Sequence, residues 1–371
     1  MKGIKRKKVL LSLLALACCF IFGGCTKSIE LSERALVQAS GIDKENGEYV
    51  VSIQYFSPEN GGGQAMLDVS KPNSYILTSR GRTLMEALAK AEQRQGKDIF
   101  YIHNRLLIIG KAAAEEGISY LTEYFSGNDD IKADVNVCIS ESKASDVVGA
   151  QPEQGILPAD SIYKLLSSAR KYGQTSQCEL ITVTRNLVEQ NGDAVLPVVQ
   201  IQQEEEEELV TLTGLALIQG FHLQEILPQE ECIGFLFTGE SVKRRALVCE
   251  LGEDRKVTLT TVGSNTSMKL SKDKKQLVFD INVTSDVAEV VSESPSSLSE
   301  EDMDILDQEL KQQIELAVQE FYENHIRETG ADYLGVFSNT ELPKEKITEY
   351  LSQMQVTVTV KSHIRRNNQQ P

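Results

Sequence analysis

The fold is decided near the C-terminus by residues 299–321, which read SEEDMDILDQELKQQIELAVQEF. Ser299 can cap a helix, and Asp302 three residues later can close a capping box at the positive end of the helix dipole. Apolar residues then recur at spacings of 3, 4, 4, 3 and 4: Met303, Leu306, Leu310, Ile314, Ala317 and Phe321. The spacing predicts a long helix that lies with this stripe on a sheet and ends at Gly330.

Segments rich in β-branched residues surround this helix. They are residues 212–218, 257–262, 277–283 and the alternating run 356–364. Strands grouped around one long helix indicate α+β layers instead of a doubly wound parallel sheet. We therefore expect a mixed α+β fold of small sheet-plus-helix domains in tandem. The C-terminal domain, residues 209–366, should be a largely antiparallel sheet packed with one long helix, followed by a polar tail at 367–371.

The preceding region, residues 35–203, mixes strand and helix signals. Predicted strands are residues 49–56, the run 106–110 buried on both faces, and the half-buried run 135–139 with Cys138 buried. Predicted helices begin at a Thr83–Glu86 capping box and end at Gly96, run from Ala112 to Phe125 with an interruption at Gly117, and run from Ser161 to Lys171 before Gly173. We expect two small α/β subdomains here.

Five consecutive glutamates, residues 204–208, separate the two regions. Adjacent like charges repel and need water, so this run predicts an exposed linker or strand-end loop, and we expect a domain boundary there. Calcium binding is the alternative, but an EF-hand-like site needs oxygen ligands spaced along a glycine-containing loop, and that pattern is missing from the run.

The N-terminus predicts a signal peptide over residues 1–24. Basic residues 5–8 precede an apolar run, residues 9–22, which is too short to span a bilayer as a helix and has the length of a signal-peptide core. Gly23, Gly24 and Cys25 follow, as in the lipobox of bacterial lipoproteins. We expect cleavage between Gly24 and Cys25, lipid attachment at Cys25, and a tether over residues 25–34. The alternatives are a secreted signal with an incidental Cys25 or a short uncleaved anchor.

The charge of the chain bears on how it reaches a membrane. Removal of the five basic residues of the leader leaves 33 basic against 54 acidic residues, so the net charge falls from −16 to −21. Such an acidic body argues against nonspecific binding to nucleic acid or anionic lipid. Two or more acyl chains can hold it at a membrane, because each buried CH₂ contributes about 0.8 kcal/mol.

The chain offers no recognisable catalytic, cofactor or metal motif. The four histidines, His103, His222, His325 and His363, lie far apart, and G-x-S-x-G, H-E-x-x-H and G-x-G-x-x-G do not occur. Cys138, Cys178, Cys232 and Cys249 form no C-x-x-C pair, so a zinc site is not expected, and the sequence leaves their disulfide state open. We expect a protein that is not an enzyme.

Several blocks carry a family resemblance that runs in order over nearly the whole mature chain. They are residues 33–44 (ERALVQASGIDK), 80–96, 103–110 (HNRLLIIG), 115–118, 143–147, 330–335 (GADYLG) and 356–366. With the lipobox, this ordered set resembles the C subunit of spore nutrient-germinant receptors, the Ger(x)C lipoprotein family.

The resemblance implies a function, a location and partners. It implies a non-catalytic subunit, lipid-anchored at Cys25 to the outer face of the spore inner membrane. Its implied partners are two integral membrane proteins, an A-type subunit and a transporter-like B subunit, with which it supports nutrient-triggered germination and dipicolinate release. The family fold is mixed α/β with three small domains.

Two other classes of protein stay open from the residues alone. A lipid-anchored solute-binding protein would need two α/β lobes, which the strand-rich last third disfavours. A cell-wall hydrolase lipoprotein would need a catalytic constellation. The nutrient, the stoichiometry and the contact surfaces are not encoded in any motif.

Overall fold

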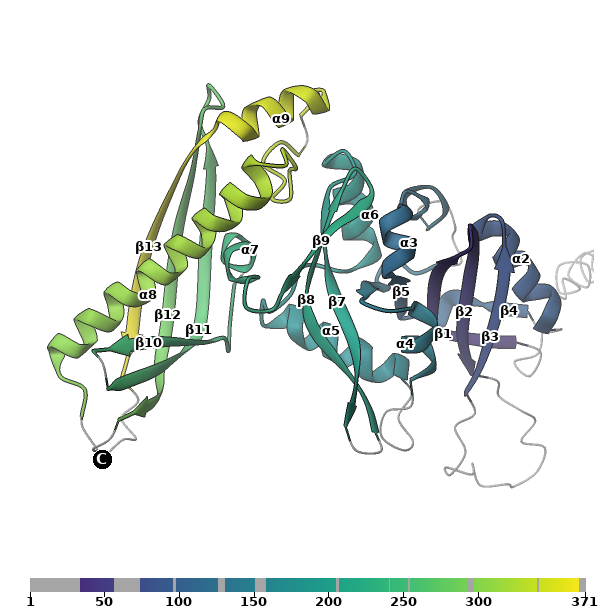
Figure 1. The fold of residues 1–371 in the computed structure, drawn as a ribbon, viewed down its shortest axis with the longest axis horizontal. Coiled ribbons are helices and arrows are strands. Elements are labelled where there is room, and N and C mark those ends of the chain that lie inside the picture. The colour runs from purple at the N-terminus through teal and green to yellow at the C-terminus, as the bar shows by residue number, and fades with distance from the viewer. Residues whose placement is uncertain are drawn as a thin grey trace, which may run out of the picture.

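The structure is a computed structural model that describes residues 34–56, 74–95, 98–125, 131–150, 158–204, 207–239, 241–252, 254–292, 297–338 and 340–366. Within these residues the chain forms two sheets in succession, each covered by helices (Figure 1). This confirms the expected mixed α+β class with a C-terminal sheet domain. The predicted signal peptide, the Cys25 tether up to residue 33 and the tail 367–371 lie outside the described residues.

The first sheet is mixed and has nine strands among the described residues. They are β1 (Arg34–Glu45), β2 (Glu48–Phe56), β3 (Ser74–Gly81), β4 (Asp98–Phe100), β5 (Leu106–Gly110), β6 (Asn136–Ser140), β7 (Ala194–Glu204), β8 (Glu207–Gln219) and β9 (His222–Pro228). The order is β3-β2-β1-β5-β6-β7-β8-β9, with β4 paired to the start of β1. β1, β5, β6 and β7 are parallel, and antiparallel strands flank them on both sides.

Helical segments connect and cover these strands. They are α2 (Leu84–Gln95), η2 (Tyr101–His103), α3 (Lys111–Glu116), η3 (Leu121–Phe125), α4 (Ala144–Gly149), α5 (Pro158–Lys171) and α6 (Leu180–Glu189). The expected start of α2 is confirmed, because the Thr83 hydroxyl accepts the N–H of Glu86 at 3.1 Å. The expected interruption after α3 is confirmed at Gly117, whose φ is +125°.

The strand β6 is buried on both faces, so its prediction as a half-buried strand is wrong. The cause is α5, which covers the face that carries its polar residues. The Asn136 side chain lies within hydrogen-bond distance of the Ser167 hydroxyl (3.5 Å) and the Arg170 guanidinium (3.4 Å). The polar residues that alternate along β6 therefore face polar side chains of a helix and not solvent. The prediction for β5 is confirmed, since every residue of Leu106–Gly110 is buried.

Residues 35–203 do not divide into two sheets, contrary to the expectation of two subdomains. One apolar core joins Ile53 of β2, Leu107 of β5 and Leu196 of β7. The parallel centre of the sheet produces this continuity, and parallel pairing between distant segments leaves no local signal in the sequence.

The acidic run lies at the end of a hairpin, which agrees with the strand-end alternative of its prediction and not with a linker between sheets. Glu204 pairs with Glu207 at the end of the β7–β8 ladder, and the first sheet continues through β8 and β9. The chain leaves this sheet only after Pro228. Charge repulsion predicts that the run needs water, but it does not distinguish a hairpin end from a linker.

The second sheet has the order β10-β11-β12-β13. Its elements are α7 (Ile233–Thr238), β10 (Ala246–Leu251), β11 (Arg255–Leu270), β12 (Gln276–Val291), α8 (Glu300–Phe321), η4 (Tyr322–Arg327), α9 (Lys344–Gln353) and β13 (Gln355–Arg365). β10, β11 and β12 are antiparallel, and β13 is parallel to β12. The largely antiparallel sheet packed with one long helix is confirmed (Figure 1).

The long helix α8 follows its sequence pattern closely. Ser299 and Asp302 form the expected capping box. The Asp302 carboxylate also accepts hydrogen bonds from both terminal nitrogens of Arg255, at 3.1 and 2.6 Å. These bonds connect the start of α8 to β11. Leu306, Leu310 and Ile314 are fully buried against the sheet. Helical structure continues through the π-helical η4 and ends before Gly330, whose φ is +69°.

Candidate functional site

The predicted lipid attachment site, Cys25, lies outside the described residues, so its lipid and the cleavage after Gly24 stay predictions. The first described residue, Arg34, begins β1 nine positions later. β1 is an inner strand that pairs with β2 along one edge and with β4 and β5 along the other. The predicted tether therefore leads directly into the interior of the first sheet.

The four histidines lie apart from one another in the structure. His103, His222 and His363 are exposed on different elements, and His325 pairs with Glu225, with 3.0 Å between Nδ1 and Oε2. In the described part of the chain, no three His, Cys, Asp or Glu side chains gather as metal ligands would. Among these same residues, no helix is both long and apolar enough to cross a bilayer.

The carboxyl ends of the parallel strands are the usual ligand position in an open α/β sheet. Here Asp43, near the end of β1, occupies that position. Its carboxylate accepts the N–H groups of Ala144 (2.7 Å) and Ser145 (2.9 Å) at the start of α4. Burial raises the pKa of Asp43, while these two N–H groups act in the opposite direction. A Cβ on Gly110 would lie 2.1 Å from Asp43 Oδ1, so the neighbouring strand must carry glycine there. The protein's own carboxylate fills this place.

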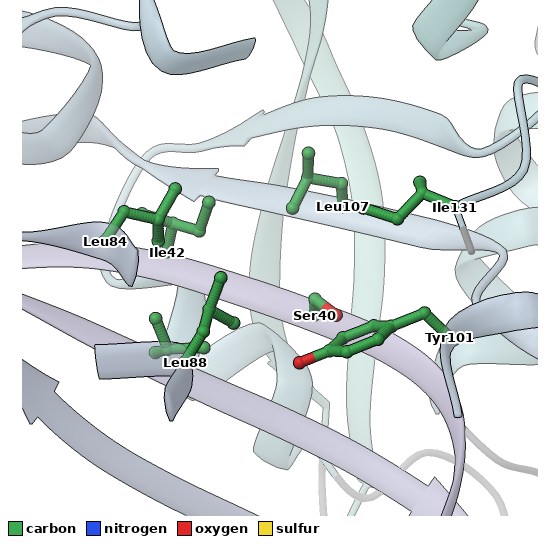
Figure 2. A pocket seen from close by; sticks show the side chains of 8 residues that line it. Ser40, Ile42, Leu84, Leu88, Tyr101, Leu107 and Ile131 are labelled. Carbon is green, nitrogen blue, oxygen red and sulfur yellow. The ribbon is translucent and has the colours of Figure 1, made fainter. Parts of the chain in front are cut away.

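A small and largely enclosed cavity lies in the first domain. It has a volume of about 10 Å³ and an apolar lining that includes Ile42, Leu88 and Leu107, with Tyr101 directed into it (Figure 2). Such a volume holds about one water molecule. A larger hollow of about 430 Å³ is open to solvent and lined by Lys111, Glu141, Thr213, Ile226 and Pro228.

The most elaborate polar site lies where the two domains meet, and Asp193 is at its centre. Its carboxylate accepts the N–H of Gly220 in the β8–β9 turn (2.9 Å) and the N–H of Asp332 in the second domain (3.0 Å). The ammonium of Lys344 lies 3.5 Å from the same carboxylate. Burial raises the pKa of Asp193, and the two N–H groups and Lys344 oppose this. Three segments are thus held by one side chain, and we call this arrangement the Asp193 junction.

Asp332 forms the other half of the junction. Its carboxylate accepts the N–H groups of Val336 (2.7 Å) and Phe337 (2.8 Å), which folds the loop after η4 into a turn. Burial, with a smaller contribution from the charge of Asp193, raises the pKa of Asp332 to about 6. With its nitrogen turned toward them, the Gln190 amide donates to the carbonyl groups of Asp332 (3.2 Å) and Asp193 (3.1 Å). Block 330–335 of the sequence therefore serves to dock the second domain.

An apolar core reinforces the junction. Val195, Leu215 and Leu217 on one face of β7 and β8 belong to the same core as Phe237 of α7 and Leu310 of α8. The opposite face of β8 contributes Ala216 and Ile218 to the core of the first domain. Because β8 supplies both cores, the two domains are joined by packing as well as by hydrogen bonds.

The four cysteines in the described part of the chain are free and buried. Burial raises the pKa of each thiol, for example to about 11 for Cys178 and about 12 for Cys249. They are therefore packing residues with little thiolate. The expectation that Cys138 is buried is confirmed.

Sequence reasoning did not single out Asp43, Asp193 or Asp332. The available signal was weak in each case. Asp43 ends a largely apolar block, Asp193 follows the turn glycine Gly192, and Asp332 lies in residues 330–335, one of the blocks that carry the family resemblance. An aspartate beside a glycine is also what an exposed turn contains.

The family models divide the chain between residues 201 and 213, around the acidic run where the sequence predicts a domain boundary, whereas the first sheet continues to Pro228. Residues 27–201 match the family described as "Spore germination protein N-terminal domain", and residues 213–368 match "Spore germination B3/ GerAC like, C-terminal". Spore germination protein KC of Bacillus subtilis (strain 168) is 22% identical over 398 residues, covering 97% of this chain and 96% of that protein. The putative spore germination protein YfkR of the same strain is 23% identical over 256 residues, covering 66% and 65%.

A solved structure, titled "Crystal Structure of the GerBC protein", aligns with 88% of this chain and 96% of its own, at a TM-score of 0.48 and 14% identity. Both matched domains define a spore germination protein. The chain belongs to the Ger(x)C family of germinant-receptor C subunits, which is not a known enzyme family. Membership implies association with other receptor subunits.

Proposed function

We propose that this protein is the lipid-anchored, non-catalytic C subunit of a spore nutrient-germinant receptor. It acts at the outer face of the spore inner membrane, held by a lipid on Cys25. It assembles there with an A-type integral membrane subunit and a transporter-like B subunit, and it supports nutrient-triggered germination.

The observation that carries the proposal is the pair of matched germination domains, which follow one another over residues 27–201 and 213–368, directly after a lipobox cysteine. The order anchor, tether, two domains is what a receptor subunit attached to a membrane surface requires. Lipidation adds what the surface charge lacks, because a body of net charge −21 is repelled by an anionic leaflet.

A scaffold or coupling role agrees with the arrangement of the described residues. The position used by ligands in open α/β sheets holds Asp43, the small cavity is about 10 Å³, and the hollow of about 430 Å³ is open to solvent. The Asp193 junction and the core shared through β8 fix one domain on the other. We assign nutrient recognition to the transporter-like partner. The anchored subunit then needs only weak contacts with its partners, because anchoring raises the local concentration.

The test is dipicolinate release from spores that carry Cys25→Ala in a strain without other nutrient receptors. Nutrient-triggered release should be lost, while release by a cationic surfactant that bypasses receptors should be kept. Thr26→Ala, which alters the neighbouring tether residue and keeps the thiol, is the matched control and should respond normally. Detergent phase partition of the chain from the same spores reports whether the lipid is present.

An unchanged nutrient response in the Cys25→Ala spores, with the chain shown to be unlipidated, would refute the anchored-receptor function. Binding of a nutrient to the purified full chain would instead favour a solute-binding role.

A further inference from the structure

A group of cations lies where the first domain meets the segment that leads into β10. Lys171 is the last residue of α5, and Lys243 and Arg244 lie just before β10; all three side chains are exposed. The guanidinium carbon of Arg244 lies 4.2 Å from the centre of the Tyr172 ring, and Lys171 Nζ lies 5.6 Å from it. We call Lys171, Lys243 and Arg244 the junction cations.

Backbone hydrogen bonds hold the junction cations in place. The N–H of Lys243 donates to the carbonyl of Tyr172 at 2.7 Å, and the N–H of Arg244 donates to the carbonyl of Thr261 at 2.7 Å. The Gln174 amide lies 3.4 Å from the carbonyl oxygens of both Lys243 and Arg244. Arg244 has a φ of +56°, a conformation that L side chains rarely adopt and that persists only where the surroundings enforce it. The segment therefore presents its side chains from a fixed backbone.

The charge of these residues is not matched within the described part of the chain. None of the junction cations forms a salt bridge there, although acidic residues outnumber basic ones by 54 to 38 in the sequence. Arg170, directly before Lys171, does find a partner: its guanidinium lies 2.8 Å from the Glu179 carboxylate. A guanidinium stacked on a tyrosine ring keeps its N–H edge available, and that edge matches a carboxylate in a bidentate pair.

We propose that the junction cations are a docking site for an acidic segment of a partner protein. This inference rests on the proposed function, in which the partner is another receptor subunit. Charge complementarity supports a carboxylate-bearing segment. An anionic bilayer is the weaker match, since each basic residue near it contributes only about 1 kcal/mol and three face the repulsion of the whole acidic body.

The site has a consequence for coupling between the domains. Lys171 and Tyr172 belong to the first domain, whereas Lys243 and Arg244 enter the second. A segment that contacts both sides binds best while the two domains keep the relative position seen here. Its binding and the Asp193 junction are therefore linked.

The experiment uses the full-length chain in spores, with a photo-crosslinking amino acid in place of the exposed Ser168, one helical turn before Lys171. Mass spectrometry of spore membranes identifies the cross-linked peptide. We expect an acidic segment of an integral membrane subunit of the receptor. Lys171→Glu/Lys243→Glu should lower its yield about tenfold, because two attractions become repulsions. Lys132→Glu/Lys272→Glu, which makes the same charge change at exposed lysines elsewhere, should leave the yield unchanged.

Cross-links to phospholipid, to a second copy of the chain or to a segment without carboxylates would each overturn the inference, as would a yield that the charge reversal does not alter. If the reversed chain does not accumulate, Lys171→Gln/Lys243→Gln removes the attraction without adding repulsion and decides by the same yield. If the chain that carries the cross-linker at position 168, without charge reversal, supports the nutrient response but gives no acidic cross-link, the inference alone is refuted. Spores without any nutrient response refute the proposed function instead.

Discussion

The carboxylate of Asp193 accepts the backbone N–H of Asp332, with 3.0 Å between oxygen and nitrogen, across 139 residues of sequence. Both aspartates are buried, at 2% exposure each, and each also binds backbone groups of its own domain. The contact joins the end of the first domain to the loop that follows the long helix of the second. This pair of carboxyl groups therefore helps to fix the relative position of the domains, together with the core shared through β8.

Removal of the Asp193 carboxylate should destabilise the protein strongly. Asp193→Ala leaves the buried N–H groups of Gly220 and Asp332 without an acceptor, and unsatisfied buried groups cost about 1–3 kcal/mol each. We expect the free energy of unfolding, measured in urea, to fall by about 2–4 kcal/mol. Asp134→Ala, at an exposed position, is the control and should change it by less than about 0.5 kcal/mol. Equal stability of the two variants would show that the junction does not hold the domains.

Stability should depend on pH through Asp332. Its pKa is about 6 in the folded state, above the value of about 3.9 for an unfolded chain. The folded state therefore binds more protons between these values, and the contribution of Asp332 to stability rises as the pH falls from about 7 to about 4. The ionised group at pH 7 costs on the order of 3 kcal/mol.

The measurement for Asp332 is the difference in unfolding free energy between wild type and Asp332→Asn at pH 7.5 and pH 5. We expect this difference to shift in favour of the wild type at the lower pH, because only the wild type gains from protonation at this position. A difference that does not move with pH would mean that Asp332 titrates like an exposed carboxyl group.

The capping box of α8 should be measurable on its own. The Ser299 hydroxyl accepts the N–H of Asp302 at 3.0 Å, and Asp302 Oδ2 accepts the N–H of Ser299 at 2.9 Å. Ser299→Ala should lower the free energy of unfolding by about 1 kcal/mol. Ser297→Ala, two residues earlier and exposed, should have no measurable effect. If both serines respond alike, the loss comes from the loop and not from the cap.

A methyl group at Gly234 should disturb the contact between α7 and α8. A Cβ there would lie 2.2 Å from the carbonyl oxygen of Ala317 and 2.5 Å from Phe321 Cβ, so one helix must move. We expect Gly234→Ala to lower the free energy of unfolding by about 1–3 kcal/mol, although alanine is the better helix former. At Gly239 the nearest atom is 3.8 Å away, so Gly239→Ala is the matched control in a thermal melt. A higher melting temperature for Gly234→Ala than for wild type would contradict this packing.

The elements that the sequence predicts well are those with local causes. The Thr83 hydroxyl cap, the Ser299 capping box, the apolar run of β5 and the alternation of β13 each depend on residues a few positions apart; at Thr83 the Glu86 carboxylate accepts the N–H of Arg82 and not that of Thr83. The second domain was predicted in outline for this reason, since its long helix and its strands carry their own periodicity.

The parts that could not be predicted depend on distant pairings. β1 pairs in parallel with β5 after an intervening segment of about sixty residues, and no residue pattern announces such a partner. The roles of Asp43 and Asp193 arise only when N–H groups from α4, or from the β8–β9 turn and the second domain, arrive beside them. The pairing of Glu204 with Glu207 was hidden for a related reason, because the acidic run contains neither the glycine nor the asparagine that is typical of a hairpin.

The inner position of β1 affects how an anchored protein resists a pulling force. With the lipid on Cys25, tension from the membrane would reach the described fold at Arg34, the first residue of β1 and nine positions after the cysteine. β1 is bonded along both edges, so a pull along its axis loads its ladder bonds together in shear instead of opening them one after another. Tension applied at Arg34 is therefore resisted by the hydrogen bonds to the strands on both sides of β1, and not by those along one edge alone.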